Sequence, residues 1–174
     1  KGLQFVSYAR AENPLNLNLI LTEANFYIQT GETEKFEILM NEAISQDPNN
    51  PTLYFNLGVV NAQKGNVSAA KRFYNKAIDI DPSYEFGYLN LVSLILAGET
   101  PIVEEMNGLG DSKADNARYD LLNSKRISIY RECVPILEKL ISINENKEAI
   151  MTLKNIYGTL GDKKGFSRME KLIK

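Results

Sequence analysis

The residues that this sequence lacks already narrow its function. It has no histidine and a single cysteine, Cys133, among 174 residues. Histidine is the commonest general base and the commonest metal ligand. One cysteine excludes an internal disulfide, and Cys133 lies in an apolar helical stretch, so we expect it to be a buried small hydrophobe. Phosphate-binding loops and convergent carboxylates are also missing, and we therefore predict no enzyme, no cofactor and no metal site.

The charge balance and the hydrophobic runs argue against two classes of partner. Lysine and arginine number 20 against 22 aspartates and glutamates, a net charge of −2. A nucleic-acid surface usually needs a clear basic excess, so we expect no nucleic-acid partner. The longest apolar candidate, Leu89–Ala97, contains Asn90 and Ser93 and falls well short of the ~20 residues that span a membrane. We expect no membrane insertion of this segment.

What the sequence does hold is a period of 34 residues. Proline recurs at this interval, and an alanine stands five residues before each proline: Ala9 and Pro14, Ala43 and Pro48, Ala77 and Pro82. A fixed period of this length is typical of stacked-repeat proteins. In such proteins each helix pair buries its apolar face against its neighbours.

The clearest unit covers residues 51–84. Its expected first helix has one side made of Tyr54, Leu57, Gly58 and Asn61. We expect Gly65 to end this helix and Asn66 to cap the next. The second helix shows an apolar face of Ala69, Ala70, Phe73, Tyr74, Ala77 and Ile78, and the pair Asp81-Pro82 ends it.

This helix–turn–helix resembles the tetratricopeptide repeat. The slots of the family pattern hold Tyr54, Leu57, Gly58, Asn61, Ala70, Tyr74, Ala77 and Pro82. Only Asn61 departs, where an aromatic residue is usual. In the preceding unit, Glu23 stands at the leucine slot and Phe36 at the first alanine slot. The resemblance, which is to bacterial members of the family, implies an all-α fold: a right-handed superhelix of antiparallel helix pairs.

The repeat register assigns nearly the whole chain to one domain, residues 1–174. We predict the second helix of an earlier repeat at 1–16, repeats at 17–50 and 51–84, a repeat at 85–146 with an insertion at about 99–127, and a last repeat at 147–174. Ala9 and Pro14 are already in register, so we interpret the chain as a fragment or a processed form of a longer protein.

The insertion is the part that the repeat does not explain. Pro101 to Met106 indicates a short helix, and Ser112 and Asp115 have capping-box spacing. We predict one long helix over about 113–143, bent at Pro135. Two interpretations stay open. The favoured one is a structural flap packed on its own extended helix, and the other is a lid or an extra wall of a binding groove.

In tetratricopeptide proteins the first helix of each pair lines a concave surface. The resemblance implies partner contacts at Asn25, Gln29, Phe55, Asn56, Val59, Gln63, Phe86, Asn90 and Ser93, none of which is charged. Asn56 and Asn90 lack the basic neighbours of family members that clamp acidic tails. Asparagine can both donate to and accept from an extended peptide backbone. The surface is alternatively covered by the protein itself.

We therefore predict a non-catalytic protein-interaction module that presents a neutral concave groove to a peptide or helix of a partner protein. The alternative is a structural module that packs against another domain of a longer chain or self-associates. The stretch Leu153–Asp162 looks like bacterial repeat proteins that are often exported. That resemblance favours the bacterial periplasm or another exported location over the cytoplasm.

Overall fold

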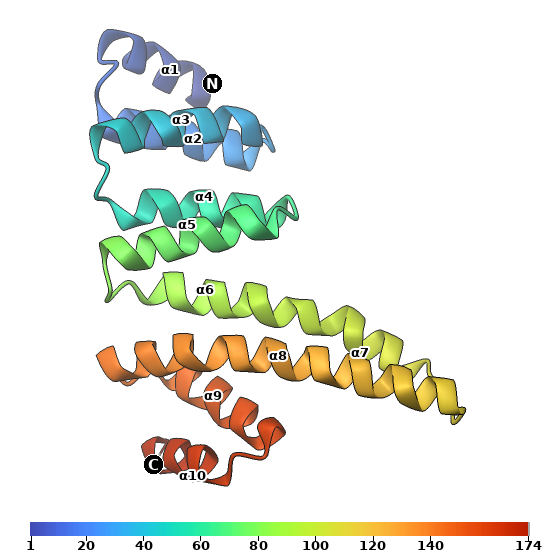
Figure 1. The fold of residues 1–174 in the computed structure, drawn as a ribbon. Helices are drawn as coiled ribbons and strands as arrows, with labels where there is room; N and C mark the ends of the chain where they lie inside the picture. Colours follow the sequence, from blue (N-terminus) through green and yellow to red (C-terminus); the bar gives the residue numbers. More distant parts are fainter. Residues whose placement is uncertain (174) are drawn as a thin grey trace. The chain divides into compact units, whose positions relative to one another are not determined.

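The computed structural model describes residues 1–173, which contain ten α-helices, one short 3₁₀ helix and no strand (Figure 1). The prediction of an all-α fold is confirmed. The helices form two compact units, Lys1–Pro82 and Ser83–Lys174. We call them the N-terminal unit and the C-terminal unit.

The N-terminal unit consists of five helices. They are α1 (Gly2–Glu12), α2 (Leu17–Gln29), α3 (Thr33–Gln46), α4 (Pro51–Gln63) and α5 (Val67–Ile80). Helices α2 and α3 form one antiparallel pair and α4 and α5 another (Figure 1). The tight turn inside each pair needs a left-handed residue, and glycine supplies it at Gly31 (φ 77°) and Gly65 (φ 76°). The predicted helix stop at Gly65 is confirmed.

Asparagine side chains begin two of these helices. Asn16 accepts a hydrogen bond from the backbone N–H of Leu19, and Asn50 accepts one from Thr52. Asn66 takes the predicted N-cap position of α5, but its side chain makes no capping hydrogen bond.

The reason lies in a buried neighbour of Asn66. Asn66 Nδ2 donates to Asn61 Oδ1 over 3.3 Å, and Asn61 Nδ2 donates to the Leu57 carbonyl over 2.9 Å. Asn61 is 7% exposed at the position where the family pattern has an aromatic residue. Because a buried amide needs partners, it engages the side chain that would otherwise cap α5.

Small residues let α4 and α5 lie close together. Ala70 and Ala77 are fully buried, and Gly58 of α4 lies against the ring of Tyr74 on α5. A Cβ atom added to Gly58 would lie 2.6 Å from two carbons of that ring. Tyr74 is itself buried, so the ring has little room to move. Glycine is therefore a packing requirement at this position.

The C-terminal unit is built around one long helix. Its elements are α6 (Glu85–Leu96), the 3₁₀ helix η1 (Ala97–Glu99), α7 (Thr100–Asn107), α8 (Lys113–Ile143), α9 (Lys147–Leu160) and α10 (Lys163–Leu172). Helices α6, η1 and α7 follow one another alongside α8 (Figure 1). The predicted helix over 113–143 is confirmed, with Pro135 inside it and the Ser112–Asp115 capping box at its start.

The inserted residues pack on the first half of α8. Met106 of α7 and Leu122 of α8 are buried, and Arg118 pairs with Glu105 over 2.5 Å. Arg126 pairs with Glu99 over 2.6 Å. These contacts place the inserted residues on α8, and both interpretations of the insertion stay predictions.

The stretch Glu85–Asn107 could cross a membrane by its length and composition alone, a test that core helices also pass. In this structure its α6 part buries Tyr88, Leu91 and Ile95, and α6 packs on α8. These three residues belong to the interior of the C-terminal unit, whereas Phe86 of the same stretch is 62% exposed.

Helix α10 is tied to α8 by a polar contact. The hydroxyl of Tyr157 on α9 donates to Glu138 on α8, and Arg168 of α10 pairs with the same carboxylate. Burial, and then the hydrogen bond to Glu138, raises the pKa of Tyr157 to about 12. The phenol therefore stays a donor throughout the neutral range.

The close approach at Gly58 gives a first prediction. Gly58→Ala gains about 0.5–1 kcal/mol of helix propensity, but overpacking against Tyr74 costs about 1–3 kcal/mol. We expect a net loss in the free energy of unfolding, measured by urea denaturation.

Gly158→Ala in α9 is the matched control, because its added Cβ would lie 3.5 Å from Phe166, an ordinary contact. We expect it to stabilise the chain by about 0.5–1 kcal/mol. If both variants stabilise equally, the contact between α4 and α5 is looser than described.

Candidate functional site

A shallow cleft in the N-terminal unit collects four of the predicted contact residues. It has a volume of about 120 Å³ and lies among α2, α3 and α4. The cleft, called the α2–α4 cleft below, is lined by Asn25, Ile28, Phe36, Asn56, Val59, Val60 and Gln63. None of these seven residues is charged.

The polar side chains of the α2–α4 cleft are all amides without partners. Within residues 1–173, the side chains of Asn25, Asn56 and Gln63 make no hydrogen bond. Each amide offers two N–H donors and one carbonyl acceptor. The cleft can therefore both donate to and accept from a ligand, and it carries no charge of its own.

Helical spacing explains why these residues meet. Asn56, Val59 and Gln63 follow at i, i+3 and i+7 on α4, so they share one side of that helix. Asn25 and Ile28 hold the same relation on α2. The apolar neighbours of this side, Leu53, Leu57 and Val60, are buried in the core, which fixes the rotation of α4.

Sequence reasoning missed Phe36 as part of the cleft. Phe36 begins the apolar face of α3, is 3% exposed and still lines the α2–α4 cleft. It fills a slot where the family pattern has alanine. That departure was the available signal, because a ring in place of a methyl group changes the space between neighbouring helices.

The other predicted contact residues lie elsewhere. Gln29 is exposed on α2 but does not line the cleft, and the ring of Phe55 lies 5.8 Å from that of Tyr74. Phe86, Asn90 and Ser93 are on α6 in the C-terminal unit. Asn90 Nδ2 donates to the Phe86 carbonyl over 2.9 Å, so one of its donors is used within its own helix.

A larger hollow of about 510 Å³ lies beside α10 but does not suggest a site. Its lining mixes charges of both signs, Asp162 with Lys164, Arg168 and Lys171. Asp162 caps α10, and Arg168 pairs with Glu138. The smaller, uncharged cleft with three unpaired amides is the better candidate.

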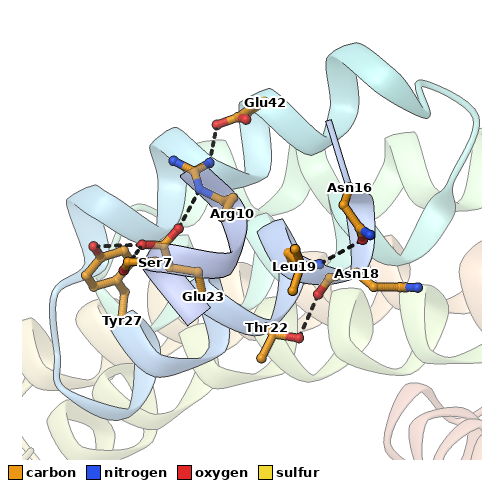
Figure 2. A network of polar contacts seen from close by, with 9 residues as sticks. All are labelled: Ser7, Arg10, Asn16, Asn18, Leu19, Thr22, Glu23, Tyr27 and Glu42. Carbon is orange, nitrogen blue, oxygen red and sulfur yellow. Dashed lines mark hydrogen bonds and ion pairs between the residues drawn. The ribbon is translucent and has the colours of Figure 1, made fainter. Parts of the chain in front are cut away.

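The most buried charge of the described residues serves the fold. Glu23 is 5% exposed on α2, at the slot where the family pattern has leucine. Its Oε1 accepts from Ser7 Oγ over 2.6 Å, and its Oε2 lies 2.6 Å from Arg10 Nε (Figure 2). Arg10 also reaches Glu42 of α3 over 2.8 Å, so it joins α1 to two other helices.

The carboxylate of Glu23 is bound within this network by residues of its own unit. Among the described residues, Glu23 Oε2 has only the ion pair with Arg10 and no aligned hydrogen bond. The Tyr27 hydroxyl is a further, long donor to Oε1 at 3.4 Å. Within residues 1–173, no group of three or more cysteine, aspartate or glutamate side chains could hold a metal ion.

The comparison with protein families matches the two helix pairs of the N-terminal unit. Residues 18–50 and 51–84 each match the model of the tetratricopeptide repeat. Residues 18–84 thus form two tetratricopeptide repeats. This family is generally a non-catalytic fold for protein–protein interaction, and the resemblance seen in the sequence is confirmed. Its bacterial type stays a prediction.

One curated relative is the tetratricopeptide repeat and J domain-containing co-chaperone DNJ1 of Fusarium oxysporum f. sp. lycopersici. It is 25% identical over 133 residues, which cover 72% of this chain and 26% of that protein. The chain thus spans about a quarter of the length of this relative.

Several solved structures resemble this chain over most of its length. The MamA protein has a TM-score of 0.64 at 15% identity, over 98% of this chain and 78% of that chain. A putative protein binding protein from Bacteroides ovatus has a TM-score of 0.59 at 20% identity, over 91% and 75%. The human IFIT1 dimer with m7Gppp-AAAA has a TM-score of 0.56 at 16% identity, over 98% and 36%. At these identities the likeness shows the fold alone.

The Arg10–Glu23 pair gives a second prediction. Arg10→Met leaves a buried carboxylate without its cation, and we expect a loss of about 2–3 kcal/mol in the free energy of unfolding. The double variant Arg10→Met/Glu23→Leu should recover most of it, because apolar residues can replace a buried ion pair at little cost. Urea denaturation measures both.

Lys64→Met is the matched control, since Lys64 pairs with Glu37 over 3.2 Å at a more exposed place. This change should cost less than about 1 kcal/mol. An Arg10→Met loss as small as that of Lys64→Met would show that Glu23 does not depend on Arg10.

Proposed function

We propose that this protein is a non-catalytic interaction module whose α2–α4 cleft holds an extended segment of a partner protein. The observation that carries the proposal is the set of three unpaired amides, Asn25, Asn56 and Gln63, in an uncharged cleft. A backbone presents alternating N–H and C=O groups, which such amides can satisfy on both sides.

The composition of the cleft supports a neutral ligand over an acidic one. A clamp for a carboxylate uses lysine or arginine, and none lines the α2–α4 cleft. Ile28 and Val59 offer apolar contact to a side chain of the segment. The whole chain carries no basic excess, which supports a protein rather than a nucleic acid as the partner.

The alternative function, packing against another domain or a second copy, has its own support. Three large apolar side chains are exposed on or just after α1: Phe5 at 74%, Tyr8 at 68% and Leu15 at 77%. Large exposed apolar side chains on one segment are typical of a surface that another protein element covers. The double variant Phe5→Ser/Tyr8→Ser should then lower any concentration-dependent association in analytical ultracentrifugation.

The test of the cleft uses a peptide selected from a random display library on the intact chain. Each hydrogen bond between an amide and a peptide contributes about 0.5–1.5 kcal/mol. Asn56→Ala/Gln63→Ala should therefore weaken binding of the selected peptide roughly tenfold, measured by calorimetry.

Asn75→Ala is the control, because Asn75 is exposed on α5 and does not line the cleft. Its affinity should equal that of the unchanged chain. If Asn56→Ala/Gln63→Ala binds the peptide as tightly as the unchanged chain does, the peptide binds elsewhere and the proposal is wrong.

A further inference from the structure

The C-terminal unit contains a second cleft at an equivalent place in the repeat. It has a volume of about 230 Å³ and lies among α6, η1, α8 and α9. This cleft, called the Glu99 cleft below, is lined by Leu96, Glu99, Tyr130, Thr152, Asn155, Ile156 and Thr159.

The two clefts use the same helical positions. Helix α4 begins at Pro51 and α9 at Lys147. Counted from these starts, Thr152, Asn155, Ile156 and Thr159 occupy the positions that Asn56, Val59, Val60 and Gln63 hold in the α2–α4 cleft. Counted from the starts of α6 and α2, Leu96 corresponds to Ile28. The two sets of lining residues therefore differ in chemistry more than in position.

The main difference is a carboxylate. Glu99 stands where the N-terminal unit has Gly31, counted from the starts of α6 and α2. Its side chain is 22% exposed, so it is partly desolvated but reachable. An acceptor of this kind is absent from the uncharged lining of the α2–α4 cleft.

Two residues of α8 hold this carboxylate in place. Oε1 of Glu99 accepts from Arg126 Nε over 2.6 Å and from the Tyr130 hydroxyl. The Arg126 guanidinium also lies 5.5 Å from the centre of the Tyr130 ring. Burial raises the pKa of Tyr130, so its hydroxyl remains a donor at neutral pH.

The second oxygen of Glu99 is available to a ligand. Both hydrogen bonds to Glu99 end on Oε1, and within residues 1–173 no hydrogen bond reaches Oε2. An ionised carboxylate can accept about four hydrogen bonds. The side chains of Thr152 and Asn155, on the α9 wall, likewise make no hydrogen bond among the described residues.

We propose that the Glu99 cleft binds a lysine or arginine side chain of a partner polypeptide. The cationic head would donate to Glu99 Oε2, and Thr152 and Asn155 would accept its remaining N–H groups. Leu96 and Ile156 provide apolar walls for the methylene stem, which such side chains bury while the head stays polar. The proposal stands independently of the α2–α4 cleft.

Arg126 offsets much of the charge of Glu99, but a carboxylate can still bridge two cations through its two oxygens, as in buried Arg–Glu–Arg triads. The bond of Arg126 is to Oε1, and together with the Tyr130 hydroxyl it holds the carboxylate in one orientation before a ligand arrives. A fixed acceptor costs little conformational entropy on binding. The hydrogen bond to Oε2 is therefore the contribution to binding affinity that distinguishes a basic side chain from an apolar one of the same length.

The experiment titrates the isotope-labelled chain with short acetylated peptides that differ at one central residue: lysine, arginine or norleucine. Amide shifts of Thr152, Asn155 and Thr159 in NMR spectra report the Glu99 cleft, and those of Asn25, Asn56 and Gln63 report the α2–α4 cleft. We expect the lysine or the arginine peptide, or both, to shift the first group, and norleucine to bind about fivefold more weakly or not at all.

Glu99→Gln keeps the size of the side chain and removes its charge, and it should abolish the preference for a basic residue. Glu105→Gln is the matched control, because Glu105 forms a similar ion pair, with Arg118, in the same inserted segment. If Glu99→Gln unfolds the unit, Thr152→Val on the opposite wall gives a second test and should weaken the binding of the basic peptide.

Equal binding of the norleucine peptide, unchanged binding to Glu99→Gln, or no shift at the Glu99 cleft with either basic peptide would overturn the proposal. Shifts confined to Asn25, Asn56 and Gln63 would also overturn it and would leave the proposed function intact. The two proposals can thus fail separately.

Discussion

The close contact of paired helices is the constraint on which the rest of the structure depends. A single amphipathic helix cannot bury its apolar face alone, and the pairing of α4 with α5 requires Gly58 against the Tyr74 ring and buried alanines at 70 and 77. That contact fixes the rotation of α4 about its axis. The side of α4 that carries Asn56 and Gln63 is turned to the α2–α4 cleft as a result, so the position of the polar residues follows from the packing of the apolar ones.

Much of the fold could be predicted from local signals. The 34-residue period, the glycine turn at Gly65 and the capping box at Ser112 are each encoded within a few residues, and the structure confirms these features. The function of Asn66 could not be predicted in the same way. Its side chain bonds to Asn61 instead of capping α5, and this depends on the burial of Asn61 in the assembled helix pair.

The residues of the candidate sites also differ in how far the sequence could predict them. The resemblance to the tetratricopeptide repeat implied Asn25, Asn56, Val59 and Gln63 as contact residues, and these four residues line one cleft. Phe36 and Glu99 were missed. Phe36 reaches the cleft because its ring is larger than the methyl group that the repeat pattern calls for. The position of Glu99 depends on Arg126 and Tyr130, which are 27 and 31 residues away in sequence.

The burial of Cys133 makes its thiol a probe of unfolding. It is the only thiol of the sequence, it is fully buried on α8, and it belongs to the C-terminal unit. An alkylating reagent can reach it only when that unit opens, so the rate of thiol modification measures the opening equilibrium of one half of the molecule. The chain thus carries a built-in reporter, without any engineered label, for whether its two halves unfold together or one at a time.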